Sequence, residues 1–135
     1  MTSDLLGESY FTKAQTRIKA LNLFMDEKDF SDVVREAQEI VELVLKGVLR
    51  KIGIEPPKLH DVGPLLIEHK QKLPLSQREA LEKIAEISKW LRKEREFAFY
   101  GDIDLIPTEE YREEDARRAM EDATFVITWA RQIFH

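Results

Sequence analysis

Residues 31–53 read Ser-Asp-Val-Val-Arg-Glu-Ala-Gln-Glu-Ile-Val-Glu-Leu-Val-Leu-Lys-Gly-Val-Leu-Arg-Lys-Ile-Gly and carry the most regular apolar pattern of the chain. The apolar side chains recur every three or four positions, the spacing of one helix face, at Val33, Ala37, Ile40, Val41, Val44, Val48 and Ile52. Ser31 is placed to cap the first turn, and Gly53 followed by Pro56-Pro57 ends the pattern. This stretch therefore predicts a long helix with a wide buried stripe.

Helical spacing extends to both sides of this stretch. A first helix is expected over residues 9–25, and a short one around residues 65–70, opened by Asp61 with Pro64 in its first turn. The segment Ser76-Gln-Arg-Glu79 has the form of a capping box, so a further helix is expected from there to Tyr100, where Gly101 stops it.

The last helix is expected to begin between Thr108 and Glu113, after a loop over residues 102–107. Acidic residues crowd its positive end. Its predicted buried face consists of Ala116, Ala119, Met120, Ala123, Ile127, Ala130 and Phe134. The alanines of this face let a neighbouring helix approach closely.

The chain has 135 residues, of which 43% are hydrophobic and 35% charged. This length suits a single domain over residues 1–135, with its core over about residues 9–134. No segment shows sustained strand alternation, and the connections between the long helices are short. We therefore predict an all-α fold, an up-and-down bundle of four main helices plus a short extra helix.

Several classes of site are disfavoured by what the sequence lacks. Without cysteine there is no disulfide, thiolate metal site or cysteine nucleophile, and the five glycines form no phosphate-binding motif. The histidine spacing supports no metal site, so neither metal nor cofactor is expected. With no apolar run long enough to span a bilayer and no basic signal sequence, we expect a cytoplasmic protein without membrane contact.

Charge is unevenly distributed along the chain. The formal net charge is −5, but residues 46–95 carry +5, whereas residues 1–45 carry −4 and residues 96–135 carry −6. A basic segment within an acidic protein can steer phosphate-containing ligands. The alternative interpretation is that these charges form Glu/Lys ion pairs on solvent-exposed helix faces, which explains the same composition.

Arg95 interrupts an apolar stripe. Steps of three or four residues pass through Leu81, Ile84, Ser88, Leu91, Arg95 and Phe99. Since an unpaired buried guanidinium is costly, Arg95 must reach a carboxylate, the last carbonyls of its helix, a second subunit or a bound anion. Either Arg95 offsets the negative end of its helix, or it forms an anion site with the nearby Arg92 and Tyr100.

Four features follow one another along the chain. They are the helix over residues 37–50 with the Lys-Ile-Gly-Ile-Glu-Pro-Pro turn after it, Leu59-His-Asp-Val62 before a Leu-Leu pair, Arg95-Glu-Phe-Ala-Phe-Tyr-Gly-Asp102, and a loop from Pro107 to Tyr111 that enters an Ala-rich helix. In this order and spacing they resemble the HEPN domain (higher eukaryotes and prokaryotes nucleotide-binding domain). The resemblance covers about residues 9–134.

The resemblance implies a helical bundle that forms a homodimer, with a polar site at the subunit interface. In ribonuclease members this site is built on an arginine followed, after four to six residues, by a histidine. Arg95 matches the arginine, Glu96 the polar residue after it, and Tyr100 stands where a histidine would be. A phenol with a pKa of about 10 is a poor base at neutral pH, which argues against metal-independent RNA cleavage but not against phosphate binding.

Other polar candidates receive structural interpretations. His60 or its neighbour Asp61 is expected to cap backbone groups, and His69 to be solvated. The bases of the long central helix either flank a nucleotide or, more typically, form its solvated face; they are Lys46, Arg50 and Lys51.

The aromatic residues allow two interpretations as well. Side chains at Trp90, Phe97, Phe99 and Tyr100 can stack on bases, but aromatics at helical spacing more typically form core or dimer contacts. Phe125 and Trp129 are expected to pack in the interior. Tyr111 resembles a HEPN family position that starts the final helix, and the resemblance implies that it closes over Arg95; its phenol needs a partner if buried.

Three functional hypotheses follow. In the first, the protein is a HEPN module that binds nucleotide or RNA phosphate through Arg95, Arg92, Tyr100 and Glu96, in a toxin–antitoxin or defence pair with a minimal nucleotidyltransferase; the resemblance alone supplies this context. In the second, it is a ribonuclease in which Arg95 and Tyr100 are catalytic. In the third, it is a structural interaction bundle in which Arg95 only ties two subunits together.

Overall fold

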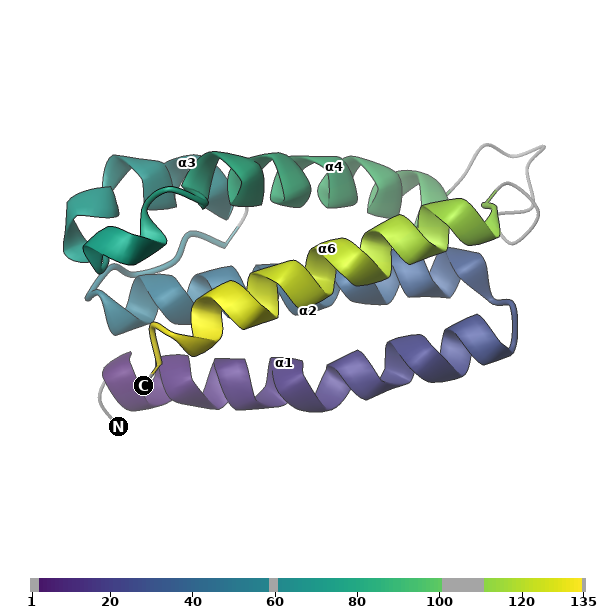
Figure 1. Cartoon of the computed structure of the whole chain (residues 1–135), viewed down its shortest axis with the longest axis horizontal. Helices are drawn as coiled ribbons and strands as arrows, with labels where there is room; N and C mark the ends of the chain where they lie inside the picture. Colours follow the sequence, from purple (N-terminus) through teal and green to yellow (C-terminus); the bar gives the residue numbers. More distant parts are fainter. Residues whose placement is uncertain (1–2, 59–60, 101–110, 135) are drawn as a thin grey trace.

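The computed structural model describes residues 3–58, 61–100 and 111–134, and side chains within residues 5–58, 61–94 and 111–134. Its elements are α1 (Ser3–Asp26), α2 (Phe30–Lys51), α3 (Val62–Glu68), the 3-10 turns η1 (Lys70–Lys72) and η2 (Leu75–Gln77), α4 (Leu81–Tyr100) and α6 (Glu113–Arg131). The described residues form helices and no strand, which confirms the predicted all-α class (Figure 1).

The helix α2 is the element on which the others pack. It contacts α1, α3, α4 and α6, and Figure 1 shows α6 lying across it between α1 and α4. Thirteen of its 22 residues are buried. The predicted stripe is confirmed from Val33 to Val48 and is wider than expected, because Val34, Leu45 and Leu49 are also fully buried.

Two glycines bring α1 and α2 into backbone contact. A methyl group on Gly47 would lie 2.9 Å from the carbonyl oxygen of Gly7, and one on Gly7 would lie 2.6 Å from that of Gly47. Beside this contact the Phe11 and Phe134 rings stack with centroids 4.8 Å apart. The expected start of the first helix at residue 9 is therefore wrong: α1 begins at Ser3, and its first turns pack against α2.

The predicted helix starts at Ser31 and Ser76 are both wrong. The helix α2 begins at Phe30 after Asp29, so Ser31 lies inside it and is buried. The capping box beginning at Ser76 does not form, because Gln77 is tied to the end of α6: its carbonyl accepts a hydrogen bond from Trp129 Nε1 (2.9 Å), and its Nε2 donates to Gln132 Oε1 (2.6 Å). The segment forms η2 instead, and α4 begins at Leu81.

The remaining boundaries lie closer to expectation. The side chain of Asp61 caps α3 as predicted, although α3 ends at Glu68 and residues 70–72 form η1. The helix α6 begins at Glu113 with three acidic residues in its first turn, as predicted. Its buried face also includes Val126 and Trp129, which the face predicted from the periodicity does not include. Met120 and Phe134, which that prediction does include, are only partly buried. The expected loop over residues 102–107 lies outside the described residues.

The end of α1 uses a left-handed residue that is not glycine. Lys28 has φ 59°, its N–H bonds to the Met25 carbonyl (3.0 Å), and the next N–H, of Asp29, bonds to the Phe24 carbonyl (2.8 Å). This is a Schellman ending, whose left-handed position favours glycine. The end of α2 repeats the geometry with Gly53 at φ 85°.

We predict that replacing Lys28 with glycine raises the free energy of unfolding by about 0.5–1 kcal/mol, because the left-handed conformation no longer strains a Cβ atom. The matched substitution Gly53→Ala should lower it by about 1 kcal/mol. Urea denaturation of both variants measures the two changes. A Lys28→Gly variant less stable than the parent would contradict the assignment of strain at this position.

Candidate functional site

The register of α4 carries the sequence-predicted stripe toward Arg95. Leu81, Ile84, Ser88 and Leu91 are all buried, with exposures of 5% or less, as predicted. Position 95 is the next on this stripe and lies in the last two turns of α4. The side chains of Arg95, Glu96 and Tyr100 lie outside the described residues.

Ser88, the polar member of the stripe, has a structural partner. Its hydroxyl donates to Asp61 Oδ1 (3.0 Å), the same oxygen that accepts from the Gly63 N–H (3.2 Å). A Cβ atom on Gly63 would lie 2.9 Å from that of Ala85, so α3 and α4 are in close contact here. Asp61 therefore both caps α3 and holds α4 against it. His60 lies outside the described residues.

Arg92 projects toward α2 rather than into open solvent. Its Nη1 lies 4.0 Å from Glu42 Oε1, and 35% of its side chain is exposed. At this distance the two charges attract without a direct hydrogen bond. The charge of Arg92 is thus partly offset, so Arg92 is not an isolated anion-binding group.

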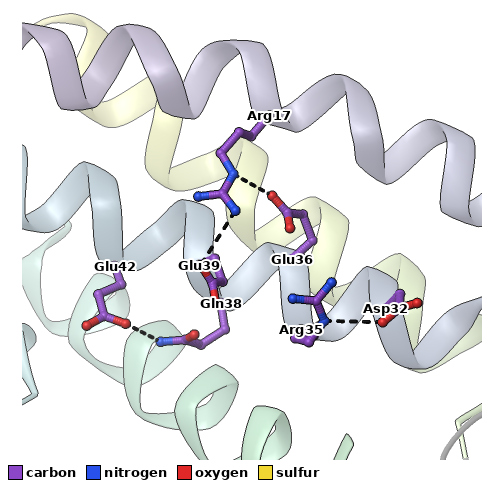
Figure 2. Close-up of polar contacts among 7 residues, drawn as sticks. All are labelled: Arg17, Asp32, Arg35, Glu36, Gln38, Glu39 and Glu42. Atoms are coloured by element: carbon purple, nitrogen blue, oxygen red, sulfur yellow. Dashed lines mark hydrogen bonds and ion pairs between the residues drawn. The ribbon is translucent and has the colours of Figure 1, made fainter. Parts of the chain in front are cut away.

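Glu42 is the centre of a polar row on α2 that the sequence reasoning did not identify. Its Oε2 accepts from Gln38 Nε2 (2.7 Å), and its Oε1 lies 2.9 Å from Lys46 Nζ (Figure 2 shows Gln38 and Glu42). Burial raises the pKa of the Glu42 carboxyl. The combined effect of Gln38, Lys46 and Arg92 lowers this pKa by more than burial raises it, so the net shift is downward. The spacing 38-42-46 is the available sequence signal, since residues four apart share a helix face.

Tyr111 fixes the chain just before α6 against the end of α4. It is buried, and its hydroxyl donates to both the carbonyl (2.8 Å) and the Oε2 (3.0 Å) of Glu94, the residue preceding Arg95. Burial first, and then the hydrogen bond to Glu94, raise the pKa of this phenol well above its ordinary value. The partner expected for a buried Tyr111 is therefore Glu94, although the contact with Arg95 itself is not described.

The other basic candidates make contacts within the protein. The Arg50 guanidinium lies 5.6 Å from the centre of the Tyr10 ring and 3.4 Å from Glu55 Oε1. Lys46 pairs with Glu42, and both Lys46 and Arg50 are half-buried rather than fully solvated. His69 is likewise half-buried, at the C-terminal end of α3.

The aromatic candidates that are described pack against the protein. Trp129 is buried and donates to the Gln77 carbonyl, which confirms its packing role. The ring of Trp90 is covered by the guanidinium of Arg118 at 3.8 Å, and that of Phe125 by Lys83 Nζ at 4.0 Å. Phe97 and Phe99 have side chains outside the described residues.

A second polar cluster joins α1 to α2. Figure 2 shows Arg17 of α1 reaching two carboxylates of α2, with Nε 2.8 Å from Glu36 Oε1 and Nη2 3.5 Å from Glu39 Oε2. The Glu36 side chain is 8% exposed, so it needs this partner. The cluster is a structural pairing between α1 and α2.

We predict that Tyr111→Phe lowers the free energy of unfolding by about 1–3 kcal/mol, because the Glu94 carbonyl and carboxylate lose their common donor. Tyr10→Phe is the matched control, since Arg50 contacts the ring of Tyr10, which this change retains. Chemical denaturation measures both. Equal free energies of unfolding for the two variants would show that the hydrogen bonds of the Tyr111 hydroxyl do not stabilise the fold.

We predict that Glu42→Gln lowers stability at pH 7 by about 1 kcal/mol. Because folding lowers the pKa of Glu42, its stabilisation is present above the ordinary value of 4.5 and disappears as the pH falls through the lower folded value. The difference between variant and parent should therefore shrink below pH 4.5. Glu55→Gln, at an exposed carboxylate, serves as control and should change stability little at either pH. A variant as stable as the parent at pH 7 would contradict the central role of Glu42.

Comparison with known proteins identifies a matching family model but no matching individual protein. No curated protein and no solved structure matches this chain. No described helix is long and apolar enough to cross a membrane, and the described residues bring together no group of three side chains suited to hold a metal ion. The family model that matches is that of the HEPN domain, over residues 8–133. Since this match spans nearly the whole chain and agrees with the helical fold, the protein belongs to the HEPN domain family.

Proposed function

We propose that this protein binds nucleotide or RNA phosphate through Arg95. Membership of the HEPN family supports a function related to nucleotides or RNA. The observation that carries the assignment to Arg95 is the register of α4, in which the stripe buried up to Leu91 continues to position 95. A guanidinium on such a stripe requires an anionic partner, and its planar fork fits phosphate oxygens.

The neighbouring residues have distinct roles in this proposal. Tyr100 orients or donates to the phosphate, and Glu96 positions the arginine. Arg92 adds positive potential rather than a direct fork, because Glu42 lies 4.0 Å from its guanidinium. Tyr111 supports the site indirectly, since its hydroxyl holds Glu94, the residue before Arg95.

The wider setting is also part of the proposal. Two copies of one up-and-down helical domain form a cytoplasmic homodimer, with the Arg95 sites at the interface. The partner is a minimal nucleotidyltransferase in a toxin–antitoxin or defence pair. These features rest on the resemblance to other HEPN domains, and a polar site shared by two copies would provide the second set of charges that a phosphate chain needs.

The test uses the purified protein, its Arg95→Ala variant, and single-stranded and structured RNA in the presence of a chelator. Arg95→Ala should weaken RNA binding about ten- to a hundredfold, because charge-assisted hydrogen bonds to phosphate are lost. Binding by the parent should also weaken as salt rises. Arg131→Ala is the matched control: Arg131 is exposed at the end of α6, far from the end of α4 in Figure 1, and its loss should leave binding nearly unchanged.

Other outcomes assign the other functions. RNA cleavage by the parent, lost in both Arg95→Ala and Tyr100→Phe, would make the protein a ribonuclease in which Tyr100 replaces histidine. No RNA affinity in the parent, together with a dimer that dissociates on Arg95→Ala, would leave only a structural interaction bundle. Equal RNA affinity of the parent and Arg95→Ala would overturn the proposed site.

A further inference from the structure

The outer side of α6 carries a stripe of exposed residues. Steps of three, four and three positions place its members on one face of the helix, and all of them are exposed: Glu121, Thr124, Thr128 and Arg131. In Figure 1, α6 lies in front of α2, and no described helix is drawn over it. We call these four residues the α6 stripe.

The two charged ends of the α6 stripe have no partner within the described part of the chain. Two other arginines of α6 lie near a carboxylate four residues away, at 3.2 and 3.7 Å. Glu121 and Arg131, by contrast, form no ion pair with any described residue. Ten residues of helix separate them by about 15 Å, so they cannot pair with each other. A partner for either charge must therefore come from another molecule.

Two open hollows flank the middle of the α6 stripe. One, of about 330 Å³, lies between α6 and α1, where α1 contributes the uncharged residues Gln15, Ile18 and Asn22. The other, of about 450 Å³, is lined by Met120 and Phe125, and the two threonines of the stripe border both hollows. In a chain of which 35% of the residues are charged, the area between the two ends of the stripe is thus uncharged. Depletion of charge at the centre with charges at the rim is typical of a protein–protein interface.

The α6 stripe is complementary to itself when its direction is reversed. The outer positions, 121 and 131, and the inner positions, 124 and 128, share one midpoint, at position 126. Two copies of α6 that cross antiparallel at this midpoint bring Glu121 opposite Arg131 of the partner subunit, and Thr124 opposite Thr128 of the partner subunit. A parallel crossing would instead bring like charges together. Such self-complementarity is what a two-fold contact between identical copies requires.

We propose that the outer face of α6 is a contact between two copies of this chain, with the α6 stripes antiparallel and an ion pair between Glu121 and Arg131 at each end. The contact covers both hollows and the apolar surface beside the threonines. It is separate from the phosphate site proposed at the end of α4 and does not depend on it. Where copies also associate at the Arg95 sites, the α6 contact joins two such pairs into a tetramer; otherwise it forms a dimer.

The first test is charge reversal, read by sedimentation velocity at protein concentrations from about 1 μM to about 1 mM, because a contact this short is expected to be weak. Glu121→Arg and Arg131→Glu should each weaken association at least about tenfold, since each brings like charges together at both ends of the contact. The double variant restores opposite charges and should associate within about threefold of the parent. Glu68→Arg is the matched control: Glu68 is exposed at the end of α3, and its reversal makes the same change in net charge without affecting association.

The second test addresses the antiparallel register. Because the chain has no cysteine, Thr124→Cys and Thr128→Cys each introduce a single thiol at an exposed position. On oxidation with diamide, an equimolar mixture of the two variants should form the intermolecular disulfide at least about threefold faster than either variant alone, since the facing positions are 124 and 128.

The contrary results are equally specific. Association that is unchanged in both charge-reversal variants, or that is not restored in the double variant, overturns the α6 contact. So does a parent protein that remains monomeric up to about 1 mM, and so does cross-linking of either cysteine variant alone as fast as the mixture. None of these results bears on the proposed function, which is tested separately by RNA binding to Arg95→Ala.

Discussion

Burial of α2 on several sides at once is the constraint from which the other features follow. Its 22 residues contact α1, α3, α4 and α6, and 13 of them are buried. Such a helix cannot keep its polar residues on one solvated face. Glu36 therefore pairs with Arg17 of α1, and Gln38 lies over Glu42 toward α4. At positions 7 and 47 the backbones of α1 and α2 approach so closely that only glycine leaves room for both.

The same constraint explains the polar contacts between α2 and α4. A charged group in a half-buried place strengthens its interactions with its neighbours, because less water screens them. Glu42 there holds three cationic or amide groups, one of them from α4. Tyr111 also holds the last turns of α4, through Glu94. The segment that carries Arg95 is thus connected to both α2 and the start of α6.

The sequence predicts the parts of this fold that depend on local periodicity. The stripe of α2, the register of α4 up to Leu91, the Asp61 cap and the acidic start of α6 are all confirmed. The helix start at Ser76 was wrong because its alternative, the contact of Gln77 with Trp129, joins residues 52 positions apart. For the site, the sequence points to Arg92, but its pairing with Glu42 depends on how α2 and α4 are rotated against each other. Such a rotation cannot be obtained from either helix alone.

Part of the basic segment over residues 46–95 fits the interpretation of helix faces with paired charges. Lys46 and Arg50 pair with carboxylates, and Arg78 donates to the carbonyls of Leu73 and Gln71. Lys83 lies over the ring of Phe125. These four bases serve contacts within the protein, whereas five lysines of the same segment are exposed: Lys58, Lys70, Lys72, Lys89 and Lys93. The excess of positive charge in this segment is therefore divided between bases engaged in helix contacts and exposed lysines, so the net charge of a segment does not by itself show where a positive surface lies.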